Sequence, residues 1–344
     1  MQVFEEIHTL LSNQKAFVCY VKPNETVWNL IVQQNTEIID FIGQAGFVFV
    51  PFHEGKQVVI PFEGNKFSQG NLEKLEQKSA ENFILETNQK EAFENLVAKG
   101  IEAIKQGEFD KVVLSRKIVL KEQISIVETF QNLISAYPTA FRYLFCHPKI
   151  GLWMGATPEQ LLKINQNQFE TVALAGTQLY SENVIWATKE IEEQQFVTSY
   201  IVTKVKDKVS QLIVSDVKTV KAGNLVHLKS FISGELTTDF LANDLIKALH
   251  PTPAVCGLPK ENAIDFILKN EGYNRKYYAG FLGEYKKDNQ TDLFVNLRCL
   301  EVDNDVVHIY VGCGITKDSH PEKEFIETEN KSMTMRNVLV VSVQ

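Results

Sequence analysis

Short apolar runs rich in Val, Ile, Phe and Tyr recur along the whole chain and are typical of β-strands. In the first quarter they lie at residues 16–22, 26–34, 47–52 and 56–62. Later runs lie at residues 111–120, 140–146, 150–156, 160–166, 169–176, 217–223, 225–236, 277–287, 292–302 and 305–315. A polar stretch over residues 63–90 separates the two groups, and we expect it to be a surface connection or a mobile segment.

Apolar residues spaced three and four apart predict helices between these strands. The pattern covers residues 91–108, 125–138, 188–212, 239–250, 260–270 and 321–336, and residues 1–15 form a further amphipathic pattern. Consecutive strands with interspersed helices favour an α+β protein with large antiparallel sheets. Regular β-α-β alternation is absent, and the GCG run at 312–314 lacks the third glycine of a dinucleotide-binding motif.

The composition narrows the possible partners. The chain has 344 residues, of which 44% are hydrophobic, and a formal net charge of -8. Nucleic-acid binding requires a basic face, so this charge argues against it. An anionic substrate would need a site that gathers its own cations. The five scattered cysteines form no C-x-x-C pair and predict a reducing cytoplasm, and no apolar stretch is long enough to predict a membrane span.

Two predicted helices carry glutamates on the extension of their apolar face. Glu190 and Glu193 precede the stripe of the helix at 188–212, while Glu324, Glu327 and Lys331 share one face of the helix at 321–336. Carboxylate oxygens without nitrogen or sulfur ligands suit Mg²⁺. Periodicity alone nevertheless favours solvated glutamates in the first helical turn, where the helix dipole attracts acidic residues.

Eight phrases in one fixed order decide between these alternatives, because they resemble motifs of the chorismate-utilising enzymes. This family includes isochorismate, salicylate, anthranilate and aminodeoxychorismate synthases. The phrases are FDKVVLSRK, GATPEQLL, ALAGT, KEIEEQQFV, LHPTPAVCGLP, RKYYAGFLGEY, VNLRC and VGCGITKDSHPEKEFIETENK. They extend from about residue 90 to the end, so we expect a variable N-terminal part (1–85) and a catalytic core (86–344) that forms one structural unit.

The resemblance implies an α+β chorismate-binding (aminodeoxychorismate synthase-like) fold. In this fold two large antiparallel sheets pack as a sandwich with helices outside, and the active site lies in a cleft between the sheets. The resemblance also implies chorismate as the small-molecule substrate and a monomer. The net charge, the cysteines and the lack of a long apolar stretch predict a cytoplasmic protein without nucleic-acid or membrane partners.

The resemblance further implies a magnesium site and a substrate site. Glu193 and Glu327 match direct Mg²⁺ ligands, and Glu190 and Glu324 match a pair that contacts the ion through water. The ion would hold the ring carboxylate of chorismate. Tyr278 and Arg298 match residues that grip the pyruvyl carboxylate, for which an Arg fork is well suited. The other positions expected at the substrate are Ala175, Gly176, Thr177, His250, Gly312, Gly314 and Lys331, with no definite role for His250.

Two further matches concern the chemistry itself. Lys111 matches the family's proposed base and Glu159 its proposed acid. Without the surrounding phrases, Lys111 would be interpreted as a strand-edge charge and Glu159 as a turn residue. The ammonia-using members usually carry glutamine at the position of Lys111, and aminodeoxychorismate synthases a nucleophilic lysine at that of Ala175. The sequence therefore predicts a water-using, Mg²⁺-dependent isochorismate synthase, an isomerase of menaquinone, siderophore or other biosynthesis.

Two alternatives stay open. Salicylate synthases share both Lys111 and Glu159 and go on to eliminate pyruvate. A non-catalytic relative that only binds a ligand would keep the fold without the chemistry.

Overall fold

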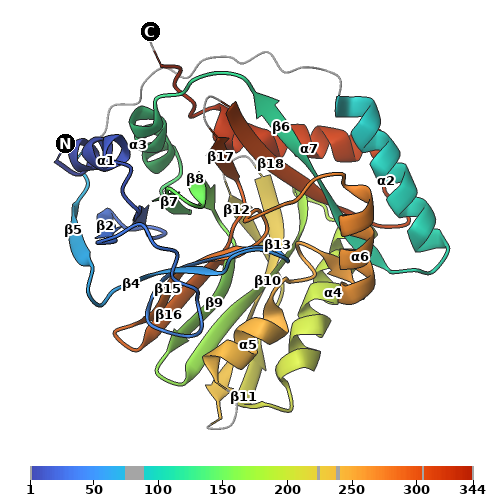
Figure 1. The fold of residues 1–344 in the computed structure, drawn as a ribbon. Coiled ribbons are helices and arrows are strands. Elements are labelled where there is room, and N and C mark those ends of the chain that lie inside the picture. Colours follow the sequence, from blue (N-terminus) through green and yellow to red (C-terminus); the bar gives the residue numbers. More distant parts are fainter. Residues whose placement is uncertain (1, 74–88, 223–224, 238–240, 304–305, 343–344) are drawn as a thin grey trace.

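The computed structural model describes residues 2–73, 89–222, 225–237, 241–303 and 306–342, arranged as helices around two large sheets (Figure 1). The helices are α1 (Gln2–Ser12), α2 (Gln89–Lys105), α3 (Ile126–Ala136), α4 (Thr188–Val205), α5 (Ala242–Leu249), α6 (Lys260–Asn270) and α7 (Pro321–Arg336). Among the described residues, no helix is long and apolar enough to cross a membrane.

The two sheets have nine strands each within the described ranges, and their neighbouring strands pair antiparallel. The first sheet runs in the order β14 (Gly257–Leu258), β6 (Lys111–Leu120), β18 (Val306–Ile315), β17 (Cys299–Asp303), β8 (Gly151–Thr157), β7 (Phe141–His147), β1 (Phe17–Val21), β2 (Val27–Val32), β5 (Lys66–Asn71). The second runs β11 (Val209–Val214), β13 (Leu225–Leu236), β10 (Gln168–Leu179), β9 (Gln160–Asn165), β16 (Gln290–Val295), β15 (Phe281–Lys287), β3 (Gly46–Val50), β4 (Val58–Pro61), with β12 (Lys218–Ala222) also on β13.

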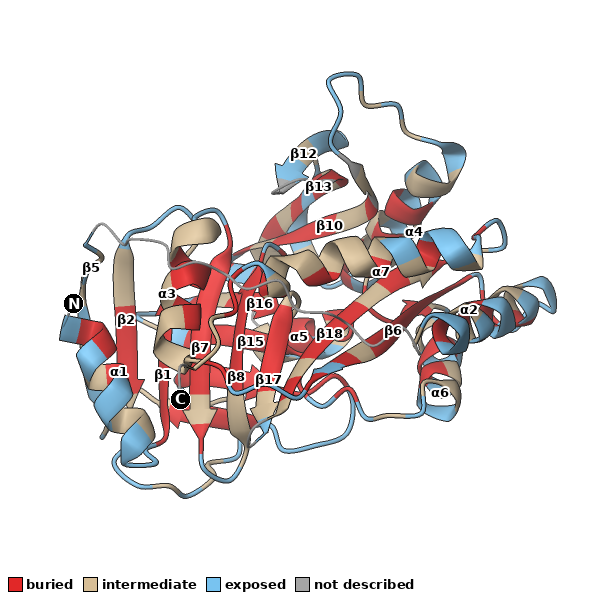
Figure 2. Cartoon of the chain, turned by 90° about the horizontal axis from the view of Figure 1, so that it is seen from above, coloured by how far each residue is buried: buried red, intermediate tan, exposed pale blue. Residues whose placement is uncertain are grey.

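Strands β6, β7 and β1 of the first sheet are buried on both faces, which explains their nearly continuous apolar sequences. On β7, Tyr143 and Phe145 belong to the core that includes residues of both sheets, whereas Leu144 between them belongs to a second core with residues of α1 and α3. Successive side chains of a strand point to opposite faces, so both sets are buried. Figure 2 shows buried strands in the interior and helices with exposed outer faces, such as α1 and α2.

Most predicted elements are confirmed, including the antiparallel α+β class; β6, α6 and α7 have the predicted bounds. The long helix was wrong in extent: α4 ends at Val205, and residues 209–214 form the edge strand β11. The apolar stripe continues through Val209 and Ile213, so spacing alone did not reveal the change from helix to strand. The polar stretch was wrong in part, because Lys66–Asn71 pairs with β2, while residues 74–88 lie outside the described residues.

One predicted strand proves to be two. The run at 292–302 divides into β16 in the second sheet and β17 in the first. Between them the buried side chain of Asn296 accepts a hydrogen bond from the Tyr143 hydroxyl (2.6 Å) and donates one to the Tyr277 carbonyl (2.9 Å). Arg298 then takes a left-handed backbone conformation with φ 50°. This crossing carries Leu297 and Arg298 to the wall of a cavity that both sheets line.

Residues before position 86 contribute strands to both sheets: β1, β2 and β5 to the first, β3 and β4 to the second. The N-terminal part is therefore built into the same sandwich as the rest. The division at residue 85 stays a prediction.

Candidate active site

A cavity that encloses about 920 Å³, including the part open to solvent, is lined by both sheets and by α4 and α7. Twelve of the predicted site residues line it: Lys111, Glu159, Ala175, Gly176, Glu190, Glu193, Tyr278, Arg298, Gly312, Gly314, Glu327 and Lys331. Residues from separate parts of the chain thus converge, as the resemblance implied.

The remaining three predicted site residues are His250, Glu324 and Thr177. His250 is not part of the cavity lining; its Nε2 lies 3.0 Å from the Pro51 carbonyl oxygen and its ring packs against Phe281, so we no longer place it at the substrate. Glu324 also lies outside the lining, buried against Lys189 at 2.8 Å. The side chain of Thr177 lies outside the described residues.

Lys111 begins β6 and is buried, with only 2% of its surface exposed. Its Nζ lies 4.0 Å from Glu193 Oε1, across from the first turns of α4. Gly314, paired with Val113 on the neighbouring strand, leaves the room for this approach. A Cβ there would lie 2.8 Å from Glu193 Oε1 and 3.0 Å from Lys111 Cε. The glycine thus allows a lysine and a glutamate to face each other beside the sheet.

Glu159 follows β8 and is 8% exposed. Its backbone is fixed on both sides, since its NH donates to Thr157 Oγ1 (3.3 Å) and its carbonyl accepts from Val295 (2.9 Å). Burial raises the pKa of the Glu159 carboxyl to about 7, although the positive charges of Lys111, Lys331 and Arg298 act in the opposite direction. A carboxyl with this pKa can donate a proton near neutral pH.

Arg298 and Tyr278 line the same cavity. Arg298 lines the cavity, and its buried Nη1 has no hydrogen-bond partner among the described residues. Tyr278 stacks on Tyr310, with ring centroids 5.5 Å apart, and its hydroxyl approaches Gly312 so closely that a Cβ there would lie 2.8 Å away. A buried guanidinium nitrogen without a partner favours an anionic ligand, and a carboxylate fits its planar fork.

The four helix glutamates differ in their surroundings. Glu190, Glu193 and Glu327 line the cavity, and Gly176 lies against α4, where a Cβ would be 2.9 Å from Glu190 Cβ. Among the described residues, no three Asp, Glu, His or Cys side chains are grouped so that they could hold a metal ion as they stand. Lysines form ion pairs with two of the four carboxylates instead.

These lysines come from the same two helices. Lys189 pairs with Glu324 at 2.8 Å, and Lys331 pairs with Glu327 at 2.5 Å while donating to the Gly312 carbonyl (3.0 Å). Burial alone would raise the pKa of Glu327, but Lys331 holds it below its ordinary value. Glu193 Oε1, by contrast, is buried and accepts no hydrogen bond within the described part of the chain. The orphaned Glu193 oxygen shares the cavity lining with Glu190 and Glu327, and carboxylate oxygens are the ligands that a hard cation prefers.

The lining residues that the sequence interpretation missed include three polar ones: Lys189, His227 and Tyr310. Lys189 directly precedes Glu190 and looks like an ordinary polar residue of a first helical turn. His227 places Nδ1 3.2 Å from the Gly176 carbonyl. Burial, with help from Arg298 and Lys331, lowers the pKa of His227 to about 3, so the imidazole is neutral at neutral pH. Only the pairing of β13 with β10 brings it there.

Comparison with known proteins places this geometry in a family. The sequence profile of the chorismate binding enzymes matches residues 57–340. Component 1 of anthranilate synthase from Archaeoglobus fulgidus is 30% identical over 277 residues, which cover 75% of this chain and 64% of that protein. The isochorismate synthase DhbC of Bacillus subtilis is 29% identical over 320 residues, covering 85% of this chain and 80% of that one.

The fold has a counterpart among solved structures. The menaquinone-specific isochorismate synthase MenF of Escherichia coli superposes with a TM-score of 0.80 at 19% identity, covering 94% of this chain and 88% of that chain. This likeness confirms the predicted two-sheet fold. From its sequence and its fold, this chain belongs to the chorismate-binding enzymes.

Proposed function

We propose that this protein is an isochorismate synthase, which converts chorismate to isochorismate by adding water at ring carbon C2 and expelling the C4 hydroxyl. The observation that carries the proposal is the presence of two buried groups of complementary kind in one cavity: the Lys111 amine and the Glu159 carboxyl, whose pKa lies near 7. The reaction needs a base for the incoming water and an acid for the leaving hydroxyl.

Arg298 and Tyr278 would bind the pyruvyl carboxylate, because Arg298 offers a buried donor without a partner. In the chemical step Lys111 takes a proton from water as the oxygen bonds to C2. The two ring double bonds shift, the C4–O bond breaks, and Glu159 donates a proton so that the hydroxyl leaves as water. Water enters and water leaves, so the conversion is an isomerisation.

Lysine at position 111 favours water over ammonia as the nucleophile. The ammonia-using members of the family usually carry glutamine there, and glutamine cannot accept a proton from water. The family relationship by itself leaves this choice open, since an anthranilate synthase component is among the relatives.

A divalent cation, which we propose to be Mg²⁺, would be held by Glu193 and Glu327 with Glu190 nearby, and would supply positive charge for the ring carboxylate of the substrate. Glu324 would act on the site indirectly, through its ion pair with Lys189. Together with Lys331 and Arg298, such a cation would offset the formal net charge of -8 at the one place where a dianion must bind.

Glu193→Gln and Glu327→Gln are expected to raise the Mg²⁺ concentration for half-saturation by about 10–100-fold, the range seen when groups around a bound metal are changed. Each variant keeps the side-chain shape and removes one charge. Titration calorimetry with Mg²⁺ alone gives a readout that does not depend on turnover. Glu322→Gln, at an exposed glutamate in the first turn of α7, is the matched control. An unchanged titration in both cavity variants would place the ion elsewhere.

Product analysis tests the function. Purified protein is incubated with chorismate and Mg²⁺, with and without ammonium, and the products are separated by chromatography. We expect isochorismate in both mixtures. Salicylate with pyruvate would replace the proposal by a salicylate synthase, and anthranilate in the ammonium mixture would overturn the inference from Lys111. No consumption of chorismate would favour a non-catalytic relative.

A further inference from the structure

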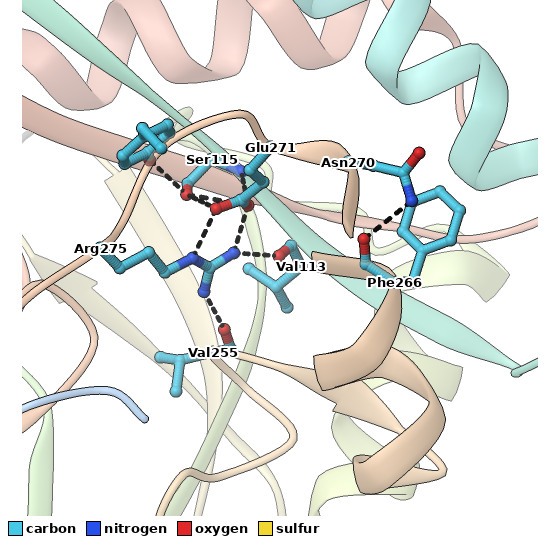
Figure 3. Close-up of polar contacts among 8 residues, drawn as sticks. Val113, Ser115, Val255, Phe266, Asn270, Glu271 and Arg275 are labelled. Carbon is cyan, nitrogen blue, oxygen red and sulfur yellow. Dashed lines mark hydrogen bonds and ion pairs between the residues drawn. The ribbon is translucent and has the colours of Figure 1, made fainter. Parts of the chain in front are cut away.

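A buried ion pair lies behind the cavity wall, outside the machinery described above. Glu271 at the end of α6 and Arg275 four residues later have side chains only 1% and 2% exposed. Arg275 Nε donates to Glu271 Oε2 at 2.8 Å, and its Nη2 donates to the other carboxylate oxygen. Figure 3 shows that both side chains lie against β6.

The pair continues the hydrogen bonding of β6 where its strand partner stops. One edge of β6 pairs with β18 from Val112 to Leu120. On the other edge β14 pairs only with Lys111 and Val112, and the Val113 NH donates to the Cys256 carbonyl just before β14 (2.9 Å). The next groups along that edge are bonded by side chains. Val113 O accepts from Arg275 Nη2 (2.6 Å), and Ser115 NH donates to Glu271 Oε1 (2.7 Å). Buried backbone groups need such partners, so the two side chains here replace a neighbouring strand.

The same guanidinium reaches two other parts of the cavity wall. Arg275 Nη1 donates to the Val255 carbonyl (2.8 Å), in the loop that precedes β14. The Arg275 carbonyl accepts from the Tyr278 NH (2.9 Å), and the guanidinium lies over the Phe52 ring at 4.4 Å. Val113, Val255 and Tyr278 all line the cavity. The Arg275 guanidinium therefore bonds two separate segments of the site, at Val113 and Val255, and lies 5.9 Å from the ring of Tyr278 in its own turn.

A buried ion pair contributes little net stability, because desolvation of the charges offsets their attraction. Its value here is geometric: a planar fork with fixed donors holds two carbonyls and a carboxylate in one arrangement. We propose that Glu271 and Arg275 are positioning residues, which fix β6 and the Val255 loop so that Lys111 and Tyr278 meet the substrate in register. The roles of Lys111 and Tyr278 in this proposal rest on the proposed function.

Arg275→Lys tests the proposal, because lysine keeps the charge but cannot make the same set of bonds. We expect kcat to fall by about 10–100-fold, since misplacement by roughly 1 Å is worth up to that much, with a smaller change in KM. Arg142→Lys is the matched control: Arg142 is equally buried and donates to the carbonyls of Ala140, Ile134, Lys22 and Glu25, away from the cavity. It should lower Tm and leave kcat unchanged.

A double variant, Glu271→Leu with Arg275→Met, removes both charges at once and leaves no unpaired ion. It should fold with a lower Tm, because the Val113 and Val255 carbonyls and the Ser115 NH lose their partners. Its kcat, measured well below that Tm, should stay as low as that of Arg275→Lys. Amide hydrogen exchange adds a readout that needs no substrate. Peptides spanning 111–116 and 252–258 should exchange faster in the double variant than in the wild type, while exchange in the remainder of the chain stays the same.

The proposal is overturned if Arg275→Lys keeps kcat within twofold of the wild type. It is equally overturned if activity falls only as Tm falls, as expected for Arg142→Lys, or if exchange at 111–116 is unchanged in the double variant. A wild-type product other than isochorismate would reject the proposed function and leave these comparisons intact, because kcat can be measured for that product.

Discussion

Replacing Lys111 with alanine is expected to lower kcat by about 10²–10⁴-fold, the usual contribution of a positioned general base. The amine is buried, lines the cavity and lies 4.0 Å from Glu193. No other side chain can act as the base at this position unless the backbone of β6 moves. Binding of chorismate should change much less, because Arg298 and Tyr278 remain. Steady-state kinetics, with substrate binding measured separately by calorimetry, check this expectation.

Chemical rescue makes the Lys111 test sharper. Adding methylamine or ethylamine to Lys111→Ala should restore part of the lost activity, since a small amine can enter the space that the side chain leaves. Lys117→Ala is the control on the same strand, because Lys117 does not line the cavity. If Lys111→Ala turned over at the wild-type rate, Lys111 would have no part in the chemistry.

Glu159→Gln is expected to have an effect of similar size, about 10²–10⁴-fold in kcat, since glutamine keeps the shape of the side chain but cannot deliver the proton. The dependence of the wild-type kcat on pH should also reflect the protonation of Glu159. An acid must be protonated to donate, and the pKa of Glu159 is about 7. Above pH 7 the protonated fraction falls about tenfold for each pH unit, so kcat should decline on the alkaline side.

The residual activity of Glu159→Gln should lack this alkaline decline near pH 7. Glu284→Gln provides a control, because Glu284 is also buried but is paired with Lys22 and Lys287 and does not line the cavity. We expect it to lower Tm while kcat and its pH profile stay as in the wild type. A decline near pH 7 that persisted in Glu159→Gln would assign it to another group.

Much of the fold could be predicted because local pattern and burial agree. The strand Lys111–Leu120 and the helix Pro321–Arg336 have the bounds that their apolar spacing indicated. The break between β16 and β17 could not be predicted, because the run at 292–302 is almost uninterrupted. Its cause is tertiary: Asn296 bonds to Tyr143 and Tyr277, which are distant in sequence.

The site was predictable only as far as the family motifs reached. They identified Lys111, Glu159 and the cavity glutamates, because these positions belong to recognisable phrases. Periodicity alone would have left the glutamates on a solvated turn. It could not show that Lys189 holds Glu324, since that contact joins two helices far apart in the chain. Arg275 opens the phrase RKYYAGFLGEY, but nothing local indicated that it and Glu271 are buried as a pair.

The central claim, that water is the nucleophile at C2, is tested most directly by running the reaction in ¹⁸O-enriched water with chorismate, Mg²⁺ and ammonium. The account predicts isochorismate with one ¹⁸O atom, in the hydroxyl on C2, because the new oxygen comes from solvent and the old hydroxyl leaves from C4. Isochorismate without solvent oxygen, or anthranilate formed from the ammonium, would contradict it.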